Sequence, residues 1–170
     1  TTSFFPSKNL GAFGDGGALF TNNDSLAERI RLLANHGSSK KYYHQEIGIN
    51  SRLDTIQAAI LEVKLKHLNA YNRSRVEAAA YYTTQLSDVE AVQVPRVSCY
   101  SEHVFHQYTL KIANQQLRDS LKASLQAKGI PSMIYYPVPL NEQQSFKQYA
   151  SDKELPKAKK MSATVLSLPM

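Results

Sequence analysis

The chain has 170 residues, of which 42% are hydrophobic and 20% charged, and it carries a formal net charge of +6. This length allows one sizeable core, or one domain with part of another, and the composition is that of an ordinary globular protein. No apolar run approaches the roughly 20 residues of a membrane helix, and no N-terminal signal is visible. The single cysteine, Cys99, cannot form an intrachain disulfide. We therefore predict a reducing, cytoplasmic compartment and no membrane partner.

The positive charge does not by itself indicate a nucleic-acid partner. The basic residues are dispersed, and Lys157, Lys159 and Lys160 form only a small cluster. Excess positive charge attracts a diphosphate or carboxylate substrate equally well. Because the chain has no aromatic-basic stripe and no known binding motif, we expect it to bind no nucleic acid.

The first part of the chain predicts a loop, a strand and a helix. Residues 1–17 are too polar and too rich in glycine for a regular element, and they predict a loop that ends in a turn. Residues 18–21 look like a short strand. A helix follows, with Asp24 or Ser25 as its N-cap, and Gly37 ends it.

The middle of the chain is dominated by helix. Residues 36–50 lack a clear period and predict an ordered loop. From Leu53 to Tyr82, apolar residues recur at steps of three and four. This pattern predicts either one long helix or two helices joined near 69–72, which would bridge domains or pack against a partner chain.

After Pro95 strands and helices alternate. We expect strands at 103–112, 130–136 and 165–168, and helical segments at 115–128 (closed by Gly129), 145–149 and 156–164. This order predicts a small α/β domain on a short sheet. Because the chain opens in a loop of functional character and stops on an apolar segment, we expect both ends to be truncated.

Lys8 is the strongest candidate for covalent chemistry. Apolar neighbours surround it in the sequence, namely Phe4, Phe5, Pro6 and Leu10. Such surroundings favour a neutral amine, the form that condenses with an aldehyde. Ser3 and Ser7 add hydroxyls that could hold an anion. The alternative is an ordinary solvated lysine in a surface loop.

The glycine-rich segment 11–17 invites comparison with a phosphate-binding loop. A nucleotide loop leads into a helix whose N-terminus faces the phosphate, whereas this segment leads into a predicted strand. We therefore interpret the glycines as permitting a tight reversal with positive backbone angles.

Three sets of motifs resemble one family. Residues 3–11 (SFFPSKNLG), followed by GDGG at 14–17, resemble the Schiff-base lysine segment of the DegT/DnrJ/StrS sugar aminotransferases. Residues 48–59 (GINSRLDTIQAA) are similar to the second signature of that family. Further matches lie in residues 129–131, 135–139 and 165–169. The resemblance covers essentially the whole chain in the right order.

This resemblance implies an α/β fold that is the C-terminal part of a type I transferase dependent on pyridoxal 5′-phosphate (PLP). Residues 1–51 would be a remnant of the large PLP-binding domain. Residues 52–86 would form a long connecting helix or helix pair, and residues 87–170 a small C-terminal α/β domain. The family also implies a homodimer with active sites shared at the subunit interface, and we predict no metal site.

The resemblance assigns roles to individual residues. Lys8 would form the Schiff base with PLP and shuttle the proton between cofactor carbon C4′ and the sugar carbon. Ser3 would bind the cofactor phosphate in its own subunit. Asn50 would reach the phosphate of the neighbouring subunit's PLP, and Arg52 would lie near the partner's substrate, where a guanidinium meets a carboxylate or diphosphate.

Structural alternatives exist for several of these residues. Asn50 is also placed to cap a helix. Arg52 is also placed to pair with Asp54 or Glu46 on the surface. The histidines and tyrosine of the 103–112 strand lie where the family has a strand near the active site, but we expect structural histidines there.

Tyr135 and Tyr136 are the remaining candidates for substrate binding. Many family members have a histidine where Tyr135 stands. A tyrosine can donate a hydrogen bond to a sugar or phosphate oxygen but carries no charge at neutral pH. The departure leaves the substrate contact open and does not alter the chemistry.

The expected substrate is a nucleotide-linked keto-sugar, UDP- or dTDP-bound, with L-glutamate as amino donor. Enzymes acting on a 3-keto, N-acetylated UDP-sugar resemble the chain most. Products of this kind feed surface polysaccharides or antibiotic sugars. Lys8 argues against the dehydrating branch, in which histidine replaces the lysine.

The chain alone is expected to be inactive. The family's acidic residue at the pyridinium nitrogen, its ring-stacking aromatic and its phosphate-binding helix start would lie before Thr1. We therefore predict poor PLP binding by this chain in isolation. The competing hypothesis is a non-catalytic α/β dimerisation fragment without PLP.

Overall fold

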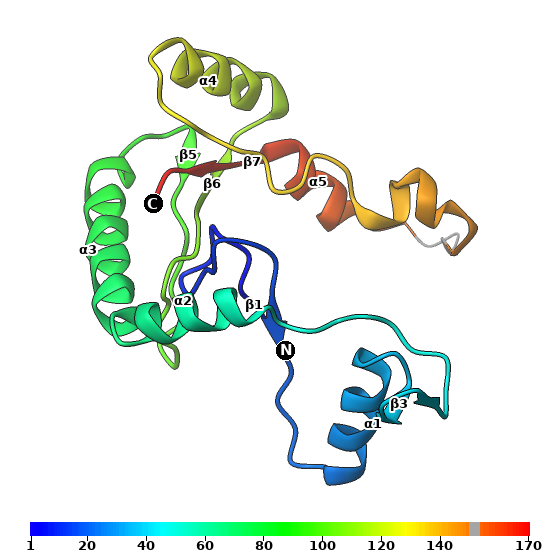
Figure 1. The fold of residues 1–170 in the computed structure, drawn as a ribbon. Coiled ribbons are helices and arrows are strands. Elements are labelled where there is room, and N and C mark those ends of the chain that lie inside the picture. Colours follow the sequence, from blue (N-terminus) through cyan, green and yellow to red (C-terminus); the bar gives the residue numbers. More distant parts are fainter. Residues whose placement is uncertain (150–153) are drawn as a thin grey trace. The chain divides into compact units, whose positions relative to one another are not determined.

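A computed structural model describes residues 1–149 and 154–170 (Figure 1). The chain forms two compact units, Thr1–Tyr71 and Asn72–Met170. The three-part division expected from the family resemblance stays a prediction. Within the described residues, no helix has both the length and the apolar character needed to cross a membrane.

The first unit opens with a loop closed at its base by two short strands. Strand β1 (Thr2–Ser3) pairs antiparallel with β2 (Gly17–Ala18), so that Ser3 lies opposite Gly17. The predicted strand at 18–21 is therefore shorter and begins one residue earlier. The pairing brings the two ends of residues 3–17 together.

Helix α1 (Asp24–Ala34) follows, and its N-cap is Asn23. The Asn23 side chain accepts a hydrogen bond from the backbone N–H of Leu26 at 3.0 Å. The predicted caps, Asp24 and Ser25, are wrong because both already lie inside the helix. At the first helical position the Asp24 carboxylate instead faces the positive end of the helix dipole.

The predicted loop at 36–50 contains a β-hairpin. Strands β3 (Ser38–Lys40) and β4 (Tyr43–His44) pair antiparallel with an irregular register. Gly37 has a φ of +68°, and a Cβ at this position would collide with the Glu46 carbonyl oxygen. Gly37 is therefore required by both backbone conformation and space.

Two helices follow, as one of the two predicted alternatives requires. They are α2 (Thr55–Leu65) and α3 (Leu68–Leu86). The break falls at Lys66 and His67, which is earlier than the predicted joint near 69–72. The N-cap of α2 is Asp54, so the interpretation of Asn50 as a helix cap is wrong.

The second unit is built on a three-stranded antiparallel sheet in the order β5-β6-β7. The strands are β5 (Val92–Gln93), β6 (Tyr108–Ile112) and β7 (Val165–Leu168). In the register of β6 and β7, Tyr108 lies opposite Leu168 and Leu110 opposite Leu166. Figure 1 shows β6 between its two neighbours, with α3 and α4 beside the sheet.

Two predicted strands are corrected. The strand expected at 103–112 begins only at Tyr108, because Phe105 has a φ of +42°, which interrupts extended backbone. The segment 130–136 is not a strand. It makes one isolated antiparallel bridge, from Met133 to Ser167, and Pro131 and Pro137 on either side have no N–H to extend the ladder.

The helical elements of the second unit follow the predictions closely. Helix α4 (Gln115–Ala127) ends one residue before the predicted boundary, and Gly129 follows with a φ of +71°. Short 3-10 helices span Leu140–Glu142 (η1) and Gln144–Tyr149 (η2). Helix α5 spans Pro156–Thr164, as predicted.

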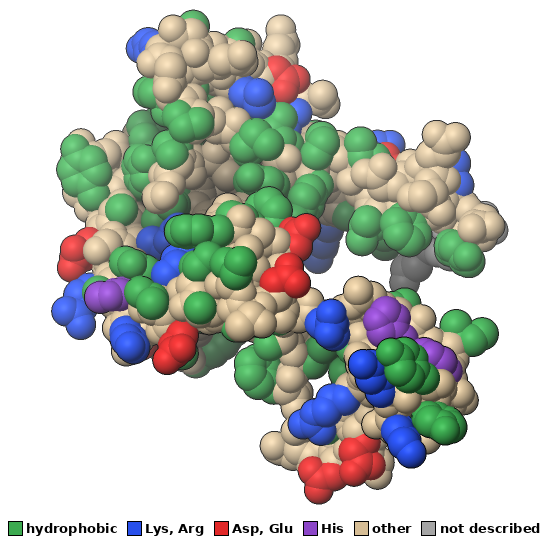
Figure 2. Space-filling model, viewed as in Figure 1, with side chains coloured by type: hydrophobic (Ala, Val, Ile, Leu, Met, Phe, Trp, Pro, Cys, Tyr) green, Lys and Arg blue, Asp and Glu red, His purple; other side chains and the backbone are tan. Residues whose placement is uncertain are grey.

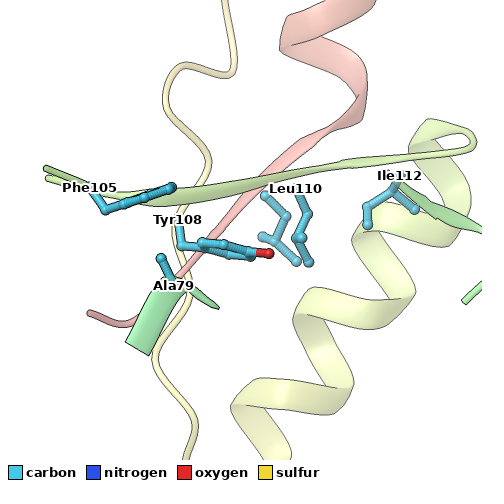
Figure 3. Close-up of a cluster of buried hydrophobic side chains, with 6 residues drawn as sticks. Ala79, Phe105, Tyr108, Leu110 and Ile112 are labelled. Carbon is cyan, nitrogen blue, oxygen red and sulfur yellow. The ribbon is translucent and has the colours of Figure 1, made fainter. Parts of the chain in front are cut away.

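The hydrophobic core of the second unit gathers on one face of β6. Tyr108, Leu110 and Ile112 alternate along the strand and are buried. Figure 3 shows the Tyr108 ring near Phe105 and Leu110, with Ala79 of α3 beside it. The Tyr108 hydroxyl shares a 2.8 Å hydrogen bond with the Thr83 hydroxyl, so its polar end is satisfied inside the core. Helices α3 and α4 complete the cluster with Tyr82, Leu86, Leu121 and Leu125.

Candidate functional site

Lys8 lies in a loop that is closed by backbone hydrogen bonds. The N–H of Lys8 donates to the Phe5 carbonyl at 2.8 Å and forms a turn. Below this turn, the N–H of Ala12 donates to the Phe4 carbonyl at 2.7 Å, and the N–H of Phe4 donates to the Gly16 carbonyl at 2.8 Å. The Lys8 side chain is half-buried. The loop therefore presents a lysine from a fixed backbone.

Gly11 closes this loop by close approach. A Cβ at Gly11 would collide with the Pro6 carbonyl oxygen and lie 2.9 Å from the Phe5 carbonyl oxygen. The expected tight reversal is present, but its predicted positive backbone angles are wrong: among the described residues, the glycines with positive φ are Gly37 and Gly129. The loop leads into β2 and not into a helix, as predicted.

Ser3 lies on β1, at the start of the same loop. Its hydroxyl oxygen accepts a 3.2 Å hydrogen bond from the N–H of Phe5. A hydroxyl that accepts one bond can still donate its own proton, and the residue is exposed. The loop thus offers an amine and a hydroxyl donor from positions five residues apart.

Helix α2 holds the same loop through two side chains. The Gln57 Oε1 accepts a hydrogen bond from the N–H of Phe13 at 2.8 Å. The Lys64 Nζ donates to the Gly11 carbonyl and lies 5.8 Å from the centroid of the Phe13 ring. In the sequence, Gln57 stands out only as part of the motif at 48–59, and Lys64 lies outside that motif. The signal was present in their seven-residue spacing, which puts both side chains on one helix face.

Asn50 and Arg52 lie in a different segment, which follows the hairpin and pairs with the end of α1. Asn50 forms an isolated antiparallel bridge with Asn35, and the N–H of Ser51 donates to the Ala34 carbonyl at 2.9 Å. The Arg52 Nε donates to the Asn50 Oδ1 at 3.4 Å, and both residues are exposed. The structure thus brings these two predicted residues together. Glu46 is one predicted ion-pair partner of Arg52. Its carboxylate instead lies 3.5 Å from the Arg29 guanidinium.

The hairpin that precedes Asn50 has an apolar and basic surface. Lys40 lies over the Tyr43 ring at 4.9 Å, and Lys41 lies over the Tyr42 ring at 5.0 Å. Ile47, at the end of the hairpin, is 99% exposed. Basic and hydrophobic side chains lie next to each other over the segment of α1 and β3 (Figure 2). Exposed apolar side chains of this kind are typical of interaction surfaces.

Tyr135 and Tyr136 belong to the second unit. Their rings meet edge to face, with centroids 5.6 Å apart, across a cis peptide bond. Tyr136 is 72% exposed, and Tyr135 is partly covered. The two rings follow the bridge of Met133 to β7 in the chain.

The histidine segment before β6 has structural contacts. The His103 Nδ1 accepts a hydrogen bond from the N–H of Phe105 at 2.9 Å. Arg75 of α3 donates to the Phe105 and His106 carbonyls, each at 3.2 Å. Tyr108 is fully buried in the core. These contacts hold the segment against α3 and agree with the structural role expected for His103.

Comparison with known proteins decides the family. The sequence profile of the DegT/DnrJ/EryC1/StrS aminotransferase family matches residues 1–170. The chain belongs to this family. Aminotransferases of the DegT/DnrJ family are PLP-dependent.

Individual relatives agree with this assignment. The chain is 47% identical over 173 residues to "Pleiotropic regulatory protein" of Geobacillus stearothermophilus, covering 100% of the chain and 46% of that protein. It is 45% identical over 170 residues to UDP-2-acetamido-2-deoxy-3-oxo-D-glucuronate aminotransferase of Pseudomonas aeruginosa, covering 99% of the chain and 45% of that protein. The chain thus spans about half the length of these relatives.

A solved structure confirms the predicted fold class. The structure of S. venezuelae DesV in complex with a ketimine intermediate matches with a TM-score of 0.91 and 41% identity. It covers 99% of the chain and 45% of the DesV chain. The mixed α/β architecture is therefore that of about 45% of a family aminotransferase.

The residues of the Lys8 loop fit the cofactor of this family. PLP has an aldehyde and a phosphate, and the loop supplies an amine from Lys8 and a hydroxyl from Ser3. The Gly11 contact leaves the backbone no room to relax toward Pro6, so the amine projects from a defined turn. The donor set is therefore appropriate for a cofactor aldehyde and phosphate.

Proposed function

We propose that the full-length protein is a PLP-dependent aminotransferase acting on a UDP- or dTDP-linked keto-sugar, with L-glutamate as amino donor. The observation that carries the proposal is Lys8, held in a closed loop within a chain that matches the family from end to end. The Pseudomonas aeruginosa relative, named for a 3-oxo UDP-sugar substrate, supports a 3-keto sugar. The aminated sugar would enter a surface polysaccharide or an antibiotic.

Lys8 is the proposed catalytic residue. PLP, when bound, supplies the electron sink for the amino transfer. The Lys8 amine would hold the cofactor at its aldehyde group and, when free, would accept and return a proton during the transfer. The Lys8 backbone is fixed by its bond to Phe5, while its four-carbon stem lets the Nζ change position. This combination suits a group that alternates between two roles.

The other proposed residues bind and orient. The Ser3 hydroxyl donates to the cofactor phosphate in the same subunit. Asn50 and Arg52 serve the neighbouring subunit of a homodimer, where Asn50 contacts the phosphate and Arg52 contacts the substrate carboxylate or diphosphate. The exposed Tyr42 and Tyr43 rings, and Ile47, support the assignment of this segment to a subunit interface. Tyr135 and Tyr136 donate hydrogen bonds to substrate oxygens.

The chain alone is proposed to be inactive and to bind PLP poorly. It spans about half of its relatives, and the family's acidic and ring-stacking residues would lie in the other half. We retain the division into a cofactor-domain remnant (1–51), connecting helices (52–86) and a small domain (87–170). Cytoplasmic location stays part of the proposal, on the basis of the single cysteine.

A visible spectrum of the full-length protein with PLP, recorded before and after addition of L-glutamate, tests the proposal. We expect an absorbance band that glutamate bleaches, that Lys8→Ala removes and that Lys128→Ala retains. Lys128 is an exposed lysine outside the proposed site and serves as the matched control. If the wild-type protein shows no such band, the proposed catalytic role of Lys8 is wrong. The hypothesis of a non-catalytic dimerisation fragment without PLP then takes its place.

A further inference from the structure

One face of α2 contacts the Lys8 loop at two points. Gln57 and Lys64 are seven residues apart, which corresponds to two helical turns and about 10 Å along the axis. Gln57 contacts the loop at Phe13, and Lys64 contacts it at Gly11. Two side chains of α2 therefore bind the backbone at the start of the glycine-rich segment, at Gly11 and at Phe13. Both helix residues are half-buried.

The Lys64 contact acts at the position that closes the loop. Gly11 lies three residues after Lys8, and a Cβ at this position would collide with the Pro6 carbonyl. The Gly11 carbonyl accepts its hydrogen bond from the Lys64 ammonium. A bond from an ionised donor is about twice as strong as one between neutral groups. Loss of Lys64 would free this carbonyl and release one side of the Lys8 turn.

The Gln57 contact depends on a second glycine. A Cβ at Gly14 would lie 3.1 Å from the Gln57 Nε2, so glycine is what lets the amide approach. From there the Gln57 Oε1 accepts the N–H of Phe13. The strand pairing of the loop ends at Ser3 and Gly17, so the Gln57 side chain supplies a backbone partner that the strands do not.

We propose that Gln57 and Lys64 are positioning residues for Lys8. By fixing Gly11 and Phe13 they hold the backbone from which the Lys8 amine acts, and they keep this backbone in place when the amine is released. The inference rests on the proposed function of Lys8. Neither residue needs to touch cofactor or substrate, because the two contacts act on Lys8 through the backbone of the loop.

Substitutions in the full-length protein separate the contacts from the bulk of the side chains. Lys64→Met removes the donor at similar length, whereas Lys64→Arg keeps a cationic donor. Gln57→Met removes the acceptor, whereas Gln57→Glu keeps an oxygen for the Phe13 N–H. Lys66→Met is the matched control, because Lys66 is exposed and lies just beyond the end of α2.

Two measurements are made on each variant. The first is a pH titration of the visible absorbance band of the PLP-loaded protein. The second is hydrogen exchange of the peptide covering residues 9–18 in the protein without cofactor. We expect both Met variants to raise the midpoint of the titration by about half to one pH unit, which is the equivalent of one lost hydrogen bond. The reason is that a loosened loop lets water stabilise the protonated form of the absorbing group. Exchange of the loop amides is expected to accelerate about fivefold.

The outcomes are distinct. Near-wild-type values in Lys64→Arg, Gln57→Glu and Lys66→Met, beside shifted values in the two Met variants, support the inference. Equal shifts in the conservative variants overturn it, as does faster exchange with an unmoved midpoint, which would show a purely structural contact. A wild-type protein without any visible band contradicts the proposed function of Lys8 instead. In that case unchanged exchange in the Met variants would also overturn the contact with the loop.

Discussion

Different interactions stabilise the interior of each of the two units. Among the described residues, the second unit buries seven hydrophobic side chains, from Ala79 to Leu166, whereas the first buries Ala12 and Leu61. The first unit relies on backbone hydrogen bonds, glycine contacts and the side chains of α2. It also leaves large apolar side chains exposed, among them Phe13 and Ile56. The proposed catalytic residue, Lys8, therefore lies in the unit with the smaller core, and we expect the stability of this unit to depend on the rest of the full-length protein.

The largest expected effect is the loss of a core side chain in the second unit. Leu110→Ala removes a fully buried leucine from the centre of β6 and should lower the free energy of unfolding by about 2–5 kcal/mol. Leu140→Ala, at an exposed leucine, should change it by less than about 0.5 kcal/mol. Urea unfolding of the chain, followed by circular dichroism, measures both. Equal effects would mean that the Leu110 cluster does not stabilise this unit.

A pair of glycine substitutions tests whether the units respond independently. Gly11→Ala places a Cβ against the Pro6 and Phe5 carbonyls and should destabilise the Lys8 loop by about 1–3 kcal/mol. Gly129→Ala meets nothing within 4 Å but has a φ of +71°, so it should cost the second unit about 1–2 kcal/mol through backbone strain.

The readouts of this pair should be opposite. Gly11→Ala should accelerate trypsin cleavage after Lys8 and leave the urea midpoint of the second unit unchanged. Gly129→Ala should lower that midpoint without affecting cleavage after Lys8. A common response of both readouts to either substitution would show that the two units unfold together.

Local signals account for the elements that could be predicted from the sequence. Helices α4 and α5 lie within one residue of their predicted bounds, because their starts and stops are encoded by neighbouring residues such as Gly129. The segment 130–136 has the apolar content of a strand, but Pro131 and the adjacent Pro137 limit it to one bridge. A hydrophobic pattern does not take into account that proline has no backbone N–H, although the prolines themselves are visible in the sequence.

The candidate site was predictable only in part. Lys8 and Ser3 stand out in a short motif, but the residues that hold their loop are far away in sequence. Gln57 is 44 positions from Phe13, and Lys64 is 53 positions from Gly11. A helical period predicts that Gln57 and Lys64 share a face, yet it does not say what that face contacts. The roles of the site residues all stay predictions, namely those of Lys8, Ser3, Asn50, Arg52, Tyr135 and Tyr136.

A smaller effect is expected from a buried cation of the second unit. Arg118 of α4 is buried, and it donates to the Ser162 carbonyl at 3.2 Å and the Val165 carbonyl at 3.4 Å. Arg118→Met should lower the free energy of unfolding by about 1–3 kcal/mol, because buried carbonyls lose their donor. Arg96→Met, at an exposed arginine, is the control. If both variants unfold alike in urea, the Arg118 contacts between α4, α5 and β7 contribute nothing measurable.

The smallest effect is expected from the loss of a helix cap, and each unit has an equivalent asparagine cap that can be replaced. Asn23 caps α1 and Asn114 caps α4, and each side chain accepts from the backbone N–H three residues later, at 3.0 and 2.9 Å. Replacing either by alanine should cost about 1 kcal/mol, which corresponds to roughly fivefold faster hydrogen exchange in its own helix. Asn114→Ala should also lower the urea midpoint, because α4 contributes Leu121 and Leu125 to the core, whereas α1 has no buried residue. A lowered urea midpoint in Asn23→Ala would show that α1 unfolds together with the core of the second unit. The two units would then not differ in what stabilises them, as we infer here that they do.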